Sequence, residues 1–284
     1  MKSNAKTNGW IWVTMAGLAA AMVAPSLAVA GGLEQSRPSD SRPAAASTGS
    51  YLQGFPRLLG GNGWETTIVL MDLGSTPVSF QQSFRGNHGA AASFNVTVDA
   101  NGTNLTTSAL QGVIAANGSV SFTLRSNNAS LLEAWSLVTF SGTQGQLGGY
   151  AILRHASGSS EFAVTVPLSN MQDYSVRVPF DNTAGFQTQL TLVNPASNMS
   201  AQVQLGYFNT QGQIILVDSI TLNPGDQTTL SLPNTYPDLA NQTGTISVLG
   251  NLTCLSVSAL RDNPSSGAIA PVPVLNFTAT TVVQ

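Results

Sequence analysis

Few residues in this sequence could carry out acid–base or nucleophilic chemistry. Histidine occurs only as His88 and His155, and the single cysteine is Cys254. No His-x-x-x-His or Cys-x-x-Cys spacing suggests a metal site, and no Gly-x-Ser-x-Gly turn suggests a hydrolase nucleophile. Cys254 lies in the strand-like run "NLTCLSVSALR", so we interpret it as a small buried side chain without a disulfide partner.

Carboxylates could still serve a glycosidase, which needs only two of them. Glu65, Glu133 and Glu161 are available, but no long loop near them predicts a cleft. We therefore predict a protein that is not an enzyme, with no catalytic residues and no cofactor.

Asp181 and Asn182 are the candidates for a cation site, because carboxylate and amide oxygens suit Ca²⁺. A structural role is the favoured interpretation, since Asp and Asn at a turn accept hydrogen bonds from their own backbone. We therefore predict no metal, with these two residues as the only candidates.

Aromatic side chains are the candidates for ligand binding. Trp135 has no aromatic counterpart in the second half of the chain, around Thr243–Thr245, so it is the first candidate for an exposed platform that stacks on sugar rings. Tyr150 and Tyr207 are further candidates for the same role. The alternative for such residues is a place in the hydrophobic core.

The amino-terminal residues 1–30 have the pattern of a secretory signal peptide. Lys2 and Lys6 precede the apolar run 10–24, and Ala28-Val29-Ala30 supplies a small-x-small cleavage pattern. We predict cleavage near Ala30, export to the periplasm or the extracellular medium, and no transmembrane anchor after processing. Residues 31–50 are small, polar and aperiodic, which is typical of a flexible leader.

The composition after the signal peptide excludes some partners. No lysine remains, and eight arginines stand against 13 acidic residues, without a basic cluster. The protein therefore offers no basic surface to which the phosphate backbone of a nucleic acid could bind. Charged residues make up 8% of the chain, so the surface must be rich in Ser, Thr, Asn and Gln. Such a surface suits neutral partners, namely a polysaccharide, a cell-surface protein or another copy of the chain.

Short apolar or alternating segments recur about every ten residues from Tyr51 onward, separated by Gly, Asn, Pro and Ser. This spacing predicts an all-β fold of antiparallel sandwiches of immunoglobulin-like size. Landmarks repeat in order: Gly63-Trp64 as Gly185-Phe186, and the strand ending at Arg154 as the strand ending at Arg261. We expect these two arginines to pair with carboxylates such as Glu161 and Asp262.

The repeat predicts two tandem sandwiches, over residues 51–170 and 171–277, followed by a tail at 278–284. The first copy is longer, because it carries an insertion around "HGAAASFNVTVDANGTNLTTSALQG".

The phrases "VPFDNTAGFQTQLTLVNPA", "LNPGDQTTLSL" and "SALRDNPSSGAIAPVP" resemble a family of secreted bacterial proteins with tandem immunoglobulin-like β-sandwich repeats. The resemblance is strong in the second repeat and weaker in the first, where "FPRLLGGNGW" departs from the Asp-Asn phrase. The resemblance implies a fold of tandem β-sandwiches and export from the cytoplasm, and it identifies no functional residues. The sequence therefore predicts a non-catalytic structural or adhesive protein of the cell envelope or extracellular matrix, with a neutral-polysaccharide-binding module as the alternative.

Overall fold

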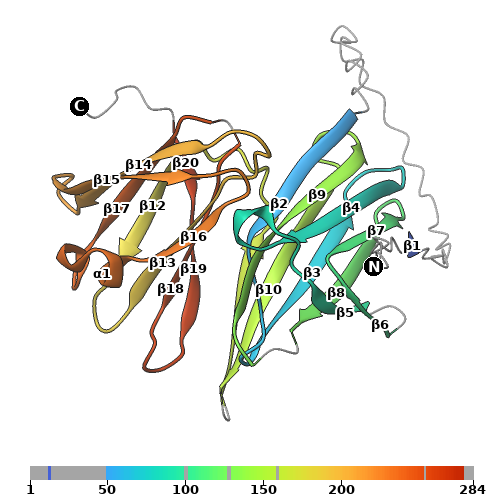
Figure 1. The fold of residues 1–284 in the computed structure, drawn as a ribbon, viewed down its shortest axis with the longest axis horizontal. Coiled ribbons are helices and arrows are strands. Elements are labelled where there is room, and N and C mark those ends of the chain that lie inside the picture. Colours follow the sequence, from blue (N-terminus) through green and yellow to red (C-terminus); the bar gives the residue numbers. More distant parts are fainter. Residues whose placement is uncertain are drawn as a thin grey trace, which may run out of the picture.

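A computed structural model describes residues 12–13, 49–98, 102–126, 129–157, 160–252 and 254–277. The described elements are strands, apart from the short helix α1 (Leu232–Thr235) and the 3-10 turns η1 (Asn87–Gly89) and η2 (Pro237–Leu239). They form two β-sandwiches side by side (Figure 1). The prediction of an all-β fold built from antiparallel sandwiches is confirmed.

The first sandwich contains two sheets, with strand orders β1-β7-β4-β9-β2 and β11-β10-β3-β8-β5-β6. Its strands are β1 (Trp12–Val13), β2 (Gly49–Gly60), β3 (Trp64–Asp72), β4 (Val78–Arg85), β5 (Phe94–Val98), β6 (Thr103–Thr107), β7 (Ala109–Ile114), β8 (Ser119–Arg125), β9 (Leu132–Gly142), β10 (Leu147–Ser157) and β11 (Ser160–Pro167).

The second sandwich has the orders β15-β14-β17-β12-β20 and β16-β13-β18-β19. Its strands are β12 (Ser175–Asp181), β13 (Gln187–Val193), β14 (Ala201–Asn209), β15 (Ile214–Leu222), β16 (Gln227–Ser231), β17 (Thr243–Gly250), β18 (Ser256–Asp262), β19 (Ile269–Val272) and β20 (Leu275–Asn276).

The two sandwiches share one topology, as the sequence repeat predicts. Strands β7-β4-β9-β2 correspond to β15-β14-β17-β12, and β11-β10-β3-β8 correspond to β19-β18-β13-β16. The insertion predicted in the first copy contains η1 and the hairpin β5–β6, which extends the sheet beyond β8. A threonine pair also recurs between equivalent strands. Thr67 Oγ1 of β3 lies 3.0 Å from Thr123 Oγ1 of β8, and Thr191 Oγ1 of β13 lies 2.9 Å from Thr229 Oγ1 of β16.

Each sandwich encloses its own hydrophobic core, because alternate residues of its strands point between its two sheets. In the first, Ile68, Leu70 and Phe122 are fully or almost fully buried. In the second, Leu190 and Val203 are fully buried in the same way.

Strand β2 departs from alternation and was not among the predicted strands. All of its residues from Gly54 to Gly60 are buried, because one face covers the first core and the other faces the second sandwich. Its register with β9 shifts between Phe55 and Leu58. This bulge accommodates Pro56, which has no N–H to donate to the hydrogen bonds between the strands. The bulge also turns Arg57 toward the second sandwich.

The short strand β1 lies within the predicted signal peptide and pairs in parallel with β7 at Gln111 and Gly112. The rest of the predicted signal peptide, the leader as far as residue 48 and the tail from residue 278 lie outside the described residues. Among the described helices, none has the length and apolar character needed to cross a membrane.

Candidate functional site at the junction of the two sandwiches

A buried polar cluster joins the two sandwiches. Arg57 is 6% exposed; its Nε lies 3.0 Å from Glu133 Oε1, and its Nη1 donates to Gln189 Oε1 across the junction at 2.6 Å. Thr229 Oγ1 donates to the same Glu133 oxygen at 2.6 Å. Burial lowers the pKa of the Arg57 guanidinium, and the charges of Glu133 and Asp262 oppose that shift. The positive charge is therefore held by partners from both sandwiches.

Gln227 of β16 makes a second connection. Its Nε2 donates to the carbonyl of Pro56 at 2.9 Å and to that of Ala134 at 3.3 Å. The β2 bulge removes Pro56 from the ladder with β9, so its carbonyl is free to accept this bond. The bulge thus supplies both an arginine and an acceptor to the junction.

The turn η1 forms a third connection. His88 Nδ1 lies 2.5 Å from Asp226 Oδ1, and the backbone N–H of Gly89 donates to the carbonyl of Gly225 at 2.8 Å. A Cβ at Gly225 would lie 2.6 Å from the Cα of Gly89, so the two backbones touch. Since η1 belongs to the insertion, the longer first repeat supplies part of the junction.

Trp135 belongs to this junction. It is 1% exposed, packs with Met171 and Val193, and donates from Nε1 to the carbonyl of Gly86 at 3.2 Å. The prediction of an exposed stacking platform is therefore wrong for Trp135. Its position is buried because the second sandwich, through Val193, covers it.

Tyr207 is likewise not a platform, since it is fully buried in the second core and packs against Tyr236 with ring centroids 5.1 Å apart. Burial raises the pKa of the Tyr207 hydroxyl far above its usual range. Tyr150 is half-buried on β10, and the structure brings it together with neither Trp135 nor Tyr207. The three aromatic candidates therefore do not form one site.

Asp181 and Asn182 set the turn that leads into β13. Asp181 Oδ1 accepts from the N–H and hydroxyl of Thr183, and its Oδ2 lies 2.6 Å from Arg261 Nη2. Asn182 donates to the carbonyl of Leu239 and accepts from the N–H of Thr188. These oxygens already have protein partners, which agrees with the structural interpretation of the pair. No cluster of three metal-ligating side chains occurs in the ranges that the structure describes.

The two equivalent arginines do pair with carboxylates, but with other ones than expected. Arg154 lies 3.8 Å from Glu65, and Arg261 pairs with Asp181. Glu65 lies directly opposite Arg154 in the register of β3 and β10, whereas Glu161 of β11 lies opposite Ala156. Asp181, at the end of β12, takes the place expected for Asp262. Cys254 also differs from the prediction, since it precedes β18 in a turn and is partly exposed.

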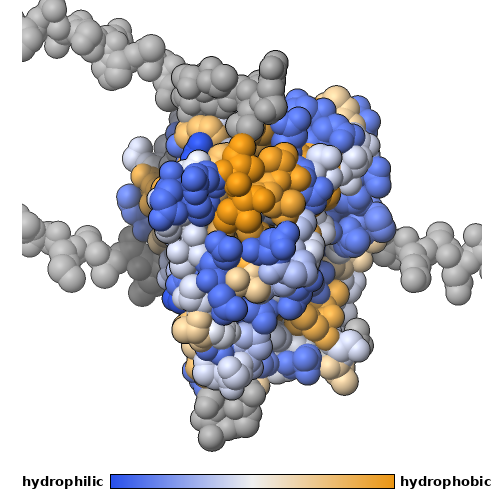
Figure 2. Space-filling model, turned by 90° about the vertical axis from the view of Figure 1, so that its left-hand side faces the viewer, coloured by the Kyte–Doolittle hydropathy of each residue, from blue (hydrophilic) through white to orange (hydrophobic). Residues whose placement is uncertain are grey.

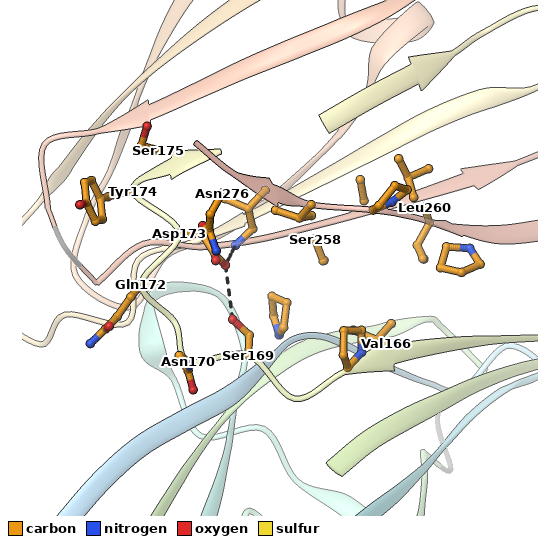
Figure 3. Close-up of a pocket in the computed structure, with 18 of the residues that line it drawn as sticks. Val166, Ser169, Asn170, Gln172, Asp173, Tyr174, Ser175, Ser258, Leu260 and Asn276 are labelled. Carbon is orange, nitrogen blue, oxygen red and sulfur yellow. Dashed lines mark hydrogen bonds between the residues drawn. The ribbon is translucent and has the colours of Figure 1, made fainter. Parts of the chain in front are cut away.

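A half-open groove of about 850 Å³ runs along the junction. Segment 165–175 forms one wall, and β18, β19 and the residues up to Phe277 form the other. Figure 3 shows Ser258 of β18 across the groove from Ser169, with Asp173 and Tyr174 at one end. Asp173 Oδ2 accepts from the N–H of Val257 at 3.0 Å and from Ser169 Oγ at 3.3 Å. Sequence reasoning missed this groove, because its walls come from two repeats.

An apolar patch lies elsewhere, on the second sandwich. Ile214 and Val217 of the edge strand β15 are 52% and 58% exposed. Figure 2 shows an apolar patch on the side of the molecule that carries β15. We refer to Ile214 and Val217 below as the β15 patch.

Comparisons of the chain with models of protein families, with curated proteins and with solved structures find no match. The resemblance to secreted repeat proteins therefore stays a prediction.

Proposed function

We propose that the protein is an exported, non-catalytic structural or adhesive component of the cell envelope or extracellular matrix, in which the two sandwiches act as one stiff unit. The observation that carries this proposal is the junction. Tandem domains joined only by a linker move freely by default. Here Arg57, Gln227 and the η1 turn connect the sandwiches at three places. A stiff two-domain unit suits a spacer or a matrix element.

Export follows from the signal-peptide pattern of residues 1–30, which also contain both lysines of the chain. Cleavage near Ala30 would remove β1 and leave β7 as an open edge. The low charge of the remaining chain suits contact with neutral surfaces.

The β15 patch supports a role in self-association. The partner proposed for this patch is a second copy of the chain. An edge strand presents unpaired backbone groups to any added strand. The equivalent edge strand in the first sandwich, β7, receives an added strand, β1, in this chain. When two β15 strands pair, Val217 and Ile214 would contact side chains of the adjacent β15 strand of the second copy.

The experiment has two arms. Cells that produce the chain are fractionated, and we expect the mature protein, beginning near Gly31, outside the cytoplasm. A strain without the protein should lose cell cohesion or surface attachment, and the wild-type chain should restore it. A full-length chain confined to the cytoplasm would overturn the proposal.

In the second arm, sedimentation of the purified protein should show association that Val217→Lys abolishes. Ser200→Lys, which adds the same charge at an exposed loop position, should leave association unchanged. Equal behaviour of both variants would exclude the β15 patch as the contact.

Polysaccharide binding through Trp135, Tyr150 and Tyr207 was the alternative. Since Trp135 and Tyr207 are buried, that form of the alternative is not proposed.

A further inference from the structure

The junction groove contains a buried hydroxyl without a partner. Ser258 is 8% exposed, and its Oγ has no hydrogen-bond partner in the described part of the chain. Its neighbours on β18, Val257 and Ala259, point into the second core, so Ser258 points to the opposite face. That face forms a wall of the groove. An unpaired buried hydroxyl is costly, so it favours a bound molecule that supplies a partner.

Asp173 supplies a second group, at the end of the same groove. Its Oδ2 is engaged with Val257 and Ser169, whereas no described residue contacts its Oδ1 through a hydrogen bond. Burial raises the pKa of this carboxyl, although the bonds from Val257 and Ser169 oppose the shift. A carboxylate that is half-buried, with one free oxygen, is an acceptor suited to a ligand hydroxyl.

The rest of the lining is uncharged. Among the described lining residues none is basic, so anionic ligands find no counter-charge. The polar members are Ser, Thr, Asn and Gln side chains, and Tyr174 is 50% exposed at the groove. Neutral hydrogen-bonding groups together with an aromatic ring suit a ligand that has both hydroxyls and apolar C–H faces.

A peptide is the less suitable ligand. The two walls include the edge strands β11 and β19, which could in principle pair with an extended peptide. Pro167 closes β11, while Pro271 and Pro273 occupy β19 and the residue after it. Proline offers no N–H to an added strand and blocks such pairing.

We propose that this groove binds a segment of a neutral saccharide chain, with Ser258 Oγ and Asp173 Oδ1 bonded to its hydroxyls and the Tyr174 ring against a sugar face. The inference does not rest on export or on the structural role, because the groove exists in the folded chain whatever its location.

The test is calorimetric titration of the purified chain with three neutral probes: cellohexaose, mannohexaose and xylohexaose. At least one should bind saturably. Ser258→Ala should weaken that binding about tenfold, and Tyr174→Ala should weaken it several-fold, whereas Tyr174→Phe, which keeps the ring, should retain it.

The stability of the Ser258→Ala variant without ligand shows whether Ser258 contacts a ligand or supports the fold. Because Ser258→Ala removes an unpaired buried hydroxyl, the free variant should unfold at the same denaturant concentration as the wild type or a higher one. Ser219→Ala, a serine exposed on β15, is the matched control for binding.

Three results would overturn the inference. The first is the absence of binding to all three probes. The second is a bound saccharide whose affinity is the same in Ser258→Ala and Tyr174→Ala. The third is selective, Ser258-dependent binding of a proline-rich peptide in place of the sugars.

Discussion

Replacement of Arg57 by alanine tests whether the junction makes the two sandwiches one unit. The guanidinium is 6% exposed and is paired with Glu133 at 3.0 Å and with Gln189 at 2.6 Å. Removal of one member of a buried ion pair typically costs about 3–5 kcal/mol, because the other charge stays buried without a partner. Glu133 is 30% exposed, which places the expected loss at the lower end, about 3 kcal/mol.

The assay is equilibrium unfolding in urea with two probes. The chain from Gly31 onward contains two tryptophans, Trp64 in the first sandwich and Trp135 of the same sandwich at the junction. Their fluorescence reports the first sandwich and its contact with the second, whereas circular dichroism reports strands of both. In the wild type the two transitions should coincide. In Arg57→Ala they should separate, because each sandwich has its own core and loses the support of the other.

Two further variants sharpen the result. Arg125→Ala removes an arginine of the same kind, paired with Glu65 at 2.8 Å but 51% exposed and within one sandwich. It should cost no more than about 1 kcal/mol and leave the transitions coincident. Arg57→Met combined with Glu133→Gln removes both charges and keeps similar volume, and it should recover most of the stability.

The reasoning would be refuted if Arg57→Ala cost no more than Arg125→Ala, or if the wild type already unfolded in two separate steps. In the second case the contacts at the junction would exist without coupling the sandwiches. The stiff-unit proposal would then lose its main support.

Two other predictions concern single positions. Gly225 and Gly212 have nearly the same backbone angle, φ +76° and +77°, but only Gly225 has a backbone within 3 Å of the added Cβ, that of Gly89. Gly225→Ala should therefore destabilise the protein by more than Gly212→Ala, whose cost is about 1 kcal/mol from the left-handed conformation alone; equal midpoints in urea would contradict this. Burial would raise the pKa of Asp181, but the bonds from Thr183 and the charge of Arg261 lower it. The stability from ionised Asp181 is therefore present above about pH 4 and is lost as pH falls through the lowered folded pKa. The difference between wild type and Asp181→Asn should be constant near neutral pH and shrink in acid, and a difference independent of pH would contradict the assignment.

Most strands could be predicted because their signals are local. The alternation in "VSFQQSF" gave β4, and the run "QTQLTLV" gave β13. The repeat then aligned the two copies, and the extra hairpin β5–β6 appeared where the first copy is longer. Strand β2 was missed because Pro56 argues against a strand, and because a segment covered on both faces shows no alternation.

The candidate site could not be predicted, because it depends on contacts between distant residues. Arg57 meets Gln189, and Gln227 meets the carbonyl of Pro56. Local patterns contain no information on which faces of two domains meet. The partner of Arg261 was also missed for this reason, since Asp181 reaches it from the end of another strand.

The junction explains why Trp135 has no aromatic match in the second repeat. The first sandwich meets its neighbour through β2 and β9, whereas the second uses β13 and β16, which correspond to β3 and β8. The contact is therefore heterologous: equivalent positions of the two copies have different surroundings. Trp135 of β9 is covered by Val193, whereas its equivalent on β17, Thr245, stays partly exposed. In a tandem duplication, a large side chain without a counterpart in the other copy can thus mark the surface that the neighbouring copy covers. For a substitution at such a position, the free energy of unfolding is measured first, and ligand binding is measured only afterwards.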